Sequence, residues 1–374
     1  MLAAAHALDP TPESFLSHLR PLQKQYGSEL AKAALDTAIL RSRARTKFSR
    51  ADKMYFIREA LEQSSSEVVS NYRAQRFAAF ARVADLGCGI GGDLLGLAAH
   101  CDVVAVDRDP LRLAMAAENI SAYDLSEKVE LLTADLLKES PPPAAALWFD
   151  PSRRDQGRRI FSVRDYKPSL ASIEAWLELT PAIGVKLSPG VRLTEIKSYE
   201  AEQEFISVGG ELKEAVLWFG PLRAGTRRAT LLPSGESLVP IPGGTVPFRR
   251  PQAVLYEPDP AVLRAGLVQD LARTLGAAMI DPQIAYLTAD EFKPTPFARA
   301  FSIEAEMPFS MKRVRAALRE RGVGRLTVKK RGSPLDVDDF IRKMKLQGDP
   351  DIERVIFLTH VQGRHAVIIG QQLV

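Results

Sequence analysis

The sequence predicts an α/β protein built on a doubly wound sheet of seven strands, with a helical region before this core and an α+β domain after it. Three observations lead to this fold class. Strand-like and helix-like segments alternate from Arg82 to about Pro233, as in a parallel sheet with crossover helices. A glycine-rich turn follows the first of these strands, where open α/β sheets bind ligands. Before this core, apolar residues recur at helical spacing and glycine is scarce.

Length and composition restrict the class of protein. The 374 residues exceed one average domain, and about 150 residues per domain predicts two or three. Two cysteines are too few for a disulfide framework or a metal quartet, which favours a reducing cytoplasm and no metal. The start lacks a basic leader, and no stretch reaches the ~20 apolar residues of a membrane span. We therefore expect a cytoplasmic protein with no membrane contact.

The first region, 1–80, is expected to be all-helical. Helical spacing of apolar residues covers 13–19, 26–44, 53–62 and 67–79. Six basic residues lie within or directly after the second of these segments: Arg41, Arg43, Arg45, Lys47, Arg50 and Lys53. This run is either a solvated helix face and loop or a surface for a phosphate backbone.

The core, 81–235, is expected to contain the seven strands. They are predicted at 82–86, 102–107, 128–133, 145–149, 183–187, 213–219 and 227–232. The intervening helices are predicted at about 92–100, 110–122 and 168–179. Ligands of such a sheet sit beyond the carboxyl ends of its strands, so the segments that follow the strands are the candidates for the site.

The turn after the first strand, within 83–93, is the strongest motif. Gly87, Gly89 and Gly91 or Gly92 stand where a side chain would hold a nucleotide-like ligand away from the backbone. Asp107 ends the second strand about twenty residues after the first, where an acid can hold both ribose hydroxyls of an adenosine. A tight turn without a ligand is the alternative.

Two cofactors fit this turn. The spacing Gly87-x-Gly89-x-x-Gly92 matches the dinucleotide fingerprint, which alone is weak evidence. Asp85, two residues before the first glycine, would repel a pyrophosphate and attract the ammonium group of S-adenosylmethionine. The sequence therefore favours S-adenosylmethionine.

The acid-x-Gly-x-Gly-x-Gly pattern that starts at Asp85 resembles the class I S-adenosylmethionine-dependent methyltransferases. The resemblance implies a Rossmann-like methyltransferase core whose seven strands end in a hairpin. It also places Asp135, two residues beyond the third strand, at the adenine. The candidate cofactor-binding residues are Asp85, Gly87, Cys88, Gly89, Asp107, Arg108, Asp135 and Leu136.

Asp150-Pro151-Ser152-Arg153 follows the fourth strand and faces the same expected cleft. It resembles the Asp- or Asn-Pro-Pro-aromatic motif of amino-group methyltransferases, which implies that Asp150 accepts hydrogens from the target amine. The stacking aromatic ring is missing here. Lys186, which ends the fifth strand, could neutralise a phosphate or a carboxylate, or be structural. The candidate catalytic residues are Asp150, Pro151, Arg153 and Lys186.

The loop after Asp150 is rich in arginine, which suits bidentate phosphate binding or base stacking. Its arginines are Arg153, Arg154, Arg158 and Arg159. A solvated loop paired with Asp155 and Asp165 is the alternative. The Asp-Pro-x-Arg pattern also resembles uracil-C5 RNA methyltransferases, which need a cysteine nucleophile. Cys88 and Cys101 both belong to the cofactor side of the sheet, so that chemistry is not expected.

The rest of the chain divides further. The predicted segments are 1–80, a helical region; 81–235, the core; 236–252, a Pro/Gly-rich linker; 253–296, a small helical connector with one helix over 259–275; and 297–374, an α+β domain. In the last, strands are expected at 299–306, 324–330, 353–360 and 364–371, and helices at 310–321 and 335–345. Between Lys312 and Arg331 nine basic residues face one acid, Glu320, which favours binding to nucleic-acid phosphates over a solvated face.

This tail, with Lys329-Lys330-Arg331-Gly332, resembles the THUMP-like domain of a group of bacterial class I methyltransferases. The core also resembles the trimethylguanosine synthase family, although Asp150-Pro151-Ser152-Arg153 departs from its Asp-Pro-Pro-Trp. Together these resemblances imply a methyltransferase that modifies a base of structured RNA, tRNA or rRNA, by direct transfer. A small-molecule methyltransferase and a non-catalytic RNA-binding protein remain alternatives, and the oligomeric state is open.

Overall fold

The computed structural model describes residues 1–151, 154–155, 158–159 and 162–373. These residues form two compact units. One comprises Met1–Gln203 and Glu214–Ala224, and the other comprises Glu204–Lys213 and Gly225–Val374. This division follows contacts in space, so the five predicted segments of the chain stay a prediction.

The N-terminal region is helical, as predicted. Its helices are α1 (Leu2–His6), α2 (Phe15–Tyr26), α3 (Ser28–Ala44), α4 (Arg58–Gln63), α5 (Glu67–Ala74) and a short 3₁₀ turn (Gln75–Phe77). The first three pack their apolar faces together around Leu22, Ala31 and Leu35. The predicted helix over 53–62 begins only at Arg58, because residues 51–53 form a turn and 54–57 have no regular secondary structure, with Met54 and Phe56 buried.

A nine-stranded sheet forms the centre of the fold. Its strands are β1 (Arg82–Leu86), β2 (Asp102–Asp107), β3 (Val129–Thr133), β4 (Ala146–Phe149), β7 (Ile183–Leu187), β8 (Glu202–Val208), β9 (Glu211–Trp218), β10 (Arg227–Leu232) and β11 (Glu236–Leu238). The order across the sheet is β11-β10-β8-β9-β7-β4-β1-β2-β3. The run from β7 to β3 is parallel, and β9 joins β7 antiparallel.

All seven predicted strands are present, but the count of seven is wrong, because β8 and β11 join the sheet. β8 is not apparent from the sequence, because it contains two glutamates, Glu202 and Glu204, that are completely buried in the fold. Strand signals rest on apolar residues at buried positions, and β8 breaks that rule. β11 lies at the start of the predicted linker and has three residues.

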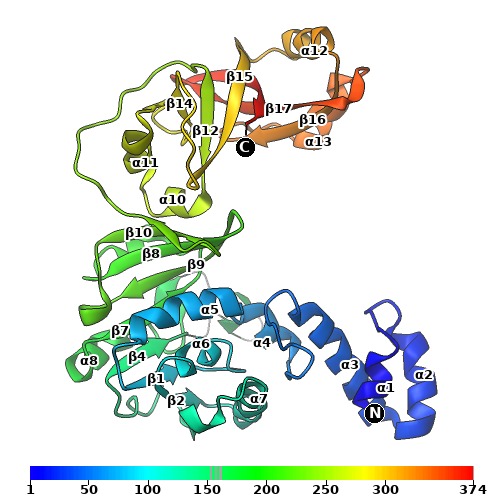
Figure 1. The fold of residues 1–374 in the computed structure, drawn as a ribbon, viewed down its shortest axis with the longest axis vertical. Helices are drawn as coiled ribbons and strands as arrows, with labels where there is room; N and C mark the ends of the chain where they lie inside the picture. Colours follow the sequence, from blue (N-terminus) through cyan, green and yellow to red (C-terminus); the bar gives the residue numbers. More distant parts are fainter. Residues whose placement is uncertain (152–153, 156–157, 160–161, 374) are drawn as a thin grey trace. The chain divides into compact units, whose positions relative to one another are not determined.

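The core helices are α6 (Leu94–Ala98), α7 (Pro110–Ser121), α8 (Ser172–Leu179) and α9 (Leu193–Ile196). α6 and α7 pack against β2 beside the glycine turn (Figure 1). Asp109 caps α7, since its Oδ1 accepts a hydrogen bond of 2.9 Å from the amide of Leu111, and Pro110 occupies the first helical position. The turn after β2 is therefore held rigidly.

The C-terminal part forms a seven-stranded sheet in the order β13-β14-β12-β15-β18-β17-β16. Its strands are β12 (Val254–Pro258), β13 (Ala278–Met279), β14 (Leu287–Ala289), β15 (Ala298–Pro308), β16 (Val323–Lys330), β17 (Asp349–Val361) and β18 (Arg364–Gln372). Its helices are α10 (Pro260–Arg264), α11 (Val268–Leu275), α12 (Met311–Glu320) and α13 (Val337–Met344). α12 and α13 pack against β16 through Val314, Leu318 and Phe340 (Figure 1).

Two predictions for this part need correction. The single helix over 259–275 is wrong, because Gly266 takes a left-handed φ of 67° and separates α10 from α11. The segment 253–296 is also more than a helical connector, since it contributes β12, β13 and β14 to the sheet. β12 pairs antiparallel with β15, so both belong to one core.

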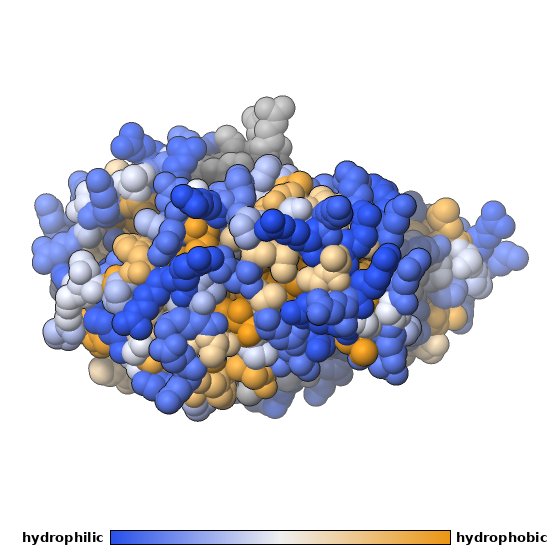
Figure 2. Space-filling view, turned by 90° about the horizontal axis from the view of Figure 1, so that it is seen from above, coloured by the Kyte–Doolittle hydropathy of each residue, from blue (hydrophilic) through white to orange (hydrophobic). Residues whose placement is uncertain are grey.

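Hydrophilic side chains cover most of the face seen in Figure 2, and small hydrophobic patches are scattered among them. In the described ranges, every helix is too short or too polar to cross a membrane.

Candidate functional site

A cavity of about 340 Å³ lies at the carboxyl ends of β1, β2, β3 and β4. The predicted cofactor-binding residues gather there: Gly87, Cys88, Gly89, Asp107, Arg108, Asp135 and Leu136 all line it. Asp150 and Pro151 line it too. Asp85 and Lys186 do not belong to its wall, and Arg153 lies outside the described residues. The fold thus brings four strand ends, far apart in the chain, around one space.

Gly87 is the tightest point of this wall. Its φ is +87°, and a β-carbon there would lie 2.8 Å from the carbonyl oxygen of Asp150. Its amide donates a hydrogen bond of 2.8 Å to the carbonyl of Val106. Gly89, with a φ of +56°, has no atom within 4 Å of the β-carbon position. The turn therefore needs glycine at 87 for packing, whereas at 89 glycine leaves open space.

This contrast predicts unequal losses of stability for two alanine variants. Gly87→Ala should lower the free energy of unfolding by about 2–4 kcal/mol, because backbone strain and the contact with Asp150 add together. Gly89→Ala should cost about 1–2 kcal/mol, since only the left-handed conformation is penalised. Urea unfolding measures both. Equal losses would contradict the role of the Asp150 carbonyl.

Asp107 is fixed by its own loop. Its Oδ2 accepts a hydrogen bond of 2.9 Å from the amide of Gly89, and its Oδ1 accepts one of 2.9 Å from Asp109. Each carboxylate oxygen has a second lone pair, so the group can still accept from a ligand. Asp135 is held similarly, and the hydrogen bond from the amide of Leu137 lowers its pKa. The backbone amides around each acid therefore orient both side chains before any ligand arrives.

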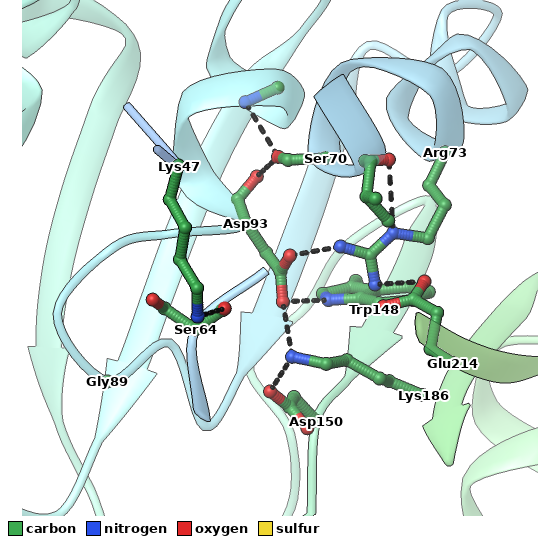
Figure 3. A network of polar contacts seen from close by, with 12 residues as sticks. Lys47, Ser64, Ser70, Arg73, Gly89, Asp93, Trp148, Asp150, Lys186 and Glu214 are labelled. Atoms are coloured by element: carbon green, nitrogen blue, oxygen red, sulfur yellow. Dashed lines mark hydrogen bonds and ion pairs between the residues drawn. The ribbon is translucent and has the colours of Figure 1, made fainter. Parts of the chain in front are cut away.

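A buried polar network, drawn in Figure 3, adjoins the cavity and includes the wall residues Asp93 and Asp150. The Lys186 ammonium donates to Asp150 Oδ2 at 2.5 Å and to Asp93 Oδ2 at 3.5 Å. Asp93 also accepts from Trp148 Nε1 at 3.2 Å and from the Arg73 guanidinium. Arg73 forms a second ion pair of 3.1 Å with Glu214. Lys186 is therefore a buried partner of Asp150 and not a free cation at the rim.

The pKa values of the acids in this network are shifted in different directions. Burial raises the pKa of Asp85 well above its ordinary value, and the neighbouring Asp93 and Asp150 raise it further. Neither carboxylate oxygen of Asp85 has a hydrogen-bond partner within the described ranges. Burial also raises the pKa of Glu214. For Asp93, burial opposes ionisation, but Arg73 and Lys186 outweigh it and lower the pKa.

The position of Asp85 makes the stability of the fold depend on pH. Because its pKa is raised, the stability from the protonated carboxyl is present below about pH 3.8 and is lost as the pH rises through the folded-state pKa. Asp85→Asn removes this dependence. Relative to the wild type, the free energy of unfolding of the variant should therefore rise as the pH increases from 4 toward 8. The rise is about 1.4 kcal/mol for each pH unit over which the carboxyl is protonated in the folded state and ionised in the unfolded state. Urea unfolding of both proteins across this pH range measures the difference in stability. A difference that does not change with pH would contradict the prediction.

The basic run at 41–53 turns out to be partly structural. Arg41 is buried, and its Nε donates to the carbonyl of Met54 at 2.7 Å. The Lys47 ammonium donates to the carbonyls of Leu61 and Ser64 at 2.7 and 2.8 Å. Arg50 pairs with Asp124 at 2.7 Å. Arg41 and Lys47 therefore hold the fold together, and Arg50 makes an exposed ion pair, so phosphate binding by the rest of the run stays a prediction.

The sequence patterns do not indicate several residues of the cavity wall. They are Glu59, Ala60, Gln63, Ser64, Ser65, Asp93, Asp109, Arg112, Lys167 and Pro168. Asp93 directly follows the glycine turn, and this position in the sequence could have indicated that it belongs to the site. The stretch 59–65 comes from the helical region, and no sequence pattern indicates that Lys47 holds it at the cavity.

Both cysteines are free, buried thiols. Cys88 lines the cavity, but burial raises the pKa of its thiol well above the ordinary value, with Asp85 and Asp107 adding to the effect. Burial raises the pKa of Cys101 to about 11. Over the described ranges, His, Cys, Asp and Glu side chains form no group suited to a metal ion.

Two families match this sequence. The family described as "RNA cap guanine-N2 methyltransferase" matches residues 80–177, and the family described as "THUMP domain-like" matches residues 298–372. Both resemblances drawn from the motifs are thereby confirmed. An "Uncharacterized S-adenosylmethionine-dependent methyltransferase" of Mycobacterium tuberculosis is 34% identical over 334 residues, which cover 86% of this chain and 91% of the relative.

More distant relatives share parts of the chain or its fold. The "Trimethylguanosine synthase" of Schizosaccharomyces pombe is 24% identical over 136 residues, which cover 31% of this chain and 54% of the relative. A crystal structure from Porphyromonas gingivalis W83, of a protein described as a methyltransferase, aligns with a TM-score of 0.76 at 21% identity. The alignment covers 98% of this chain and all of that one, so the two share their fold.

Proposed function

The chain belongs to the S-adenosylmethionine-dependent methyltransferases, and from this premise we propose that it methylates a base of structured RNA, tRNA or rRNA. The observation that carries the proposal is the joining of two features in one chain. The match to a family of RNA guanine methyltransferases covers the strand ends around the cavity, and a THUMP-like domain with an exposed basic helix follows it.

The residues of the cavity fit the cofactor. The space left open at Gly89 would be filled by any side chain, and among the described residues the buried carboxyl group of Asp85 has no hydrogen-bond partner. We assign Asp107 to the ribose hydroxyls and Asp135 with Leu136 to the adenine. Gly87, Cys88 and Gly89, with Asp85 beneath them, are assigned to the methionine part, and Arg108 to the rim. The cofactor, when bound, supplies an electrophilic methyl group on a sulfonium.

Asp150 is the residue we assign to the accepting nitrogen. Its Oδ2 is held by Lys186, and its side chain is one-fifth exposed, so a carboxylate oxygen can accept an amine hydrogen. Pro151 restricts the backbone that presents it. Positioning of the amine in line with the methyl group would then supply most of the acceleration. Arg153 is assigned to a phosphate or a base.

The basic stretch of the C-terminal domain divides into two sets. Six of its nine cations make contacts in the fold: Arg315, Arg321, Arg325, Lys329, Lys330 and Arg331. Lys312, Arg313 and Arg319, all on α12, are exposed, and among the described residues their side chains have no ion pair or hydrogen bond. These three are the ones we assign to RNA phosphates.

The test is methyl transfer from labelled S-adenosylmethionine by the purified full chain. Bulk tRNA and rRNA from a strain without the gene should take up label, and mass spectrometry of their nucleosides should identify the base. The same RNA from wild-type cells is the control and should take up less. Label that appears only in a small-molecule extract would refute the proposal.

A further inference from the structure

We propose that Arg73 is a positioning residue for methyl transfer: by neutralising Asp93, it leaves Lys186 to hold the carboxylate of Asp150 at the cavity. The proposal rests on the assignment of Asp150 to the accepting nitrogen. Arg73 itself lies on α5, outside the methyltransferase core, and is not part of the cavity wall.

The fold delivers the Arg73 guanidinium into the core. α5 lies against α6 so closely that a β-carbon at Gly96 would come within 2.5 Å of the carbonyl oxygen of Ser70. The side chain of Arg73 is 3% exposed and stacks over Trp148, with 4.4 Å between its Cζ and the ring centroid. The two terminal nitrogens of its guanidinium contact Asp93 on one side and Glu214 on the other. A lysine lacks this planar fork, so it cannot place a separate nitrogen on each of these two carboxylates.

Lys186 stands between two carboxylates. Its ammonium is 2.5 Å from Asp150 and 3.5 Å from Asp93, so it is engaged mainly with Asp150. Asp93 is buried and needs a cation nearby, since an unpaired buried charge costs several kcal/mol. The guanidinium of Arg73 is the cation that pairs with Asp93. Without the guanidinium bridge, the ammonium of Lys186 should move to Asp93 and release Asp150.

The chain contains a matched control for this argument. Arg76 lies one turn after Arg73 and stacks over Trp218 at 4.6 Å, much as Arg73 stacks over Trp148. It pairs with the buried Glu202 at 2.8 Å. It therefore has the same kind of environment, yet its ion pair leads to Glu202 and not toward Lys186.

The experiment compares Arg73→Lys with Arg76→Lys in the full chain. Both should lose stability by similar amounts in thermal unfolding. Arg73→Lys should lower kcat for methyl transfer to RNA by about 10–100-fold, because the accepting nitrogen is misplaced. Calorimetry should find an unchanged Kd for S-adenosylhomocysteine. Arg76→Lys should keep its kcat.

A second readout does not depend on RNA. A crystal structure of Arg73→Lys should place the Lys186 ammonium closer to Asp93 than to Asp150. In an Asp150→Ala background, Arg73→Lys should lower the rate no further, because the two residues act through one carboxylate. If Arg73→Lys does not fold, Arg73→Gln is measured in the same way.

The outcomes separate this proposal from the proposed function. If the wild-type chain transfers no label to RNA, the proposed function fails, and the position of Lys186 in the variant still decides this proposal. If Lys186 stays on Asp150 in the variant, or if the rate losses of the two residues simply add, the positioning role of Arg73 is refuted. An equal loss of kcat in Arg76→Lys would also refute it.

Discussion

Replacing Asp150 with alanine is expected to lower methyl transfer to RNA by about 10²–10³-fold, the usual loss when one oriented polar group at a reacting centre is removed. The variant keeps the glycine turn, Asp107 and Asp135, so the Kd for S-adenosylhomocysteine should change by no more than about threefold, or less than 1 kcal/mol. Transfer of label to bulk RNA and calorimetry measure the two quantities.

Asp150→Asn separates acceptance of a hydrogen bond from removal of a proton. An asparagine keeps a carbonyl oxygen that can accept from the amine, but it loses the ion pair with Lys186. If Asp150 only orients the amine, the asparagine variant should retain much more activity than the alanine variant. Wild-type activity in Asp150→Ala would contradict any role of this residue in the transfer.

Reversing the exposed charges of α12 should have the second largest effect. The change of Lys312, Arg313 and Arg319 to glutamate removes three phosphate contacts that the proposed function assigns. The slope of log K against log salt should therefore become shallower by about 2–3, and RNA affinity at 0.1 M salt should fall by on the order of 10–100-fold. Filter binding across a salt series measures both. The Kd for S-adenosylhomocysteine should not change.

The control is an equal change of charge elsewhere in the same unit. Arg249, Lys293 and Arg364 are exposed, and their change to glutamate alters the net charge by the same amount. If α12 is a specific phosphate-binding site, the control variant should lose less RNA affinity than the α12 variant. Equal effects of the two triple variants would indicate general attraction between charges, and the assignment of α12 would then be wrong.

Much of the catalytic core was predictable because its signals are local. The buried strand before Gly87, the glycines of the turn and Asp107 at the end of the next strand are each specified by short stretches of chain. In a parallel sheet the strand ends share one edge, so Asp150 could be expected at the same cavity. The helical region and the basic stretch of α12 were visible for the same reason. β8 was not, because its buried glutamates contradict the local signal.

The sequence by itself determined the type of core, the class of cofactor and the strand ends around the site, since these depend on periodicity and on residues close together in the chain. Only the tertiary structure decided which charges neutralise one another. Arg73, Asp93, Lys186 and Glu214 come from four separate elements and meet in one buried cluster. A charged side chain can enter the interior only with a partner, and the choice among partners depends on packing in three dimensions.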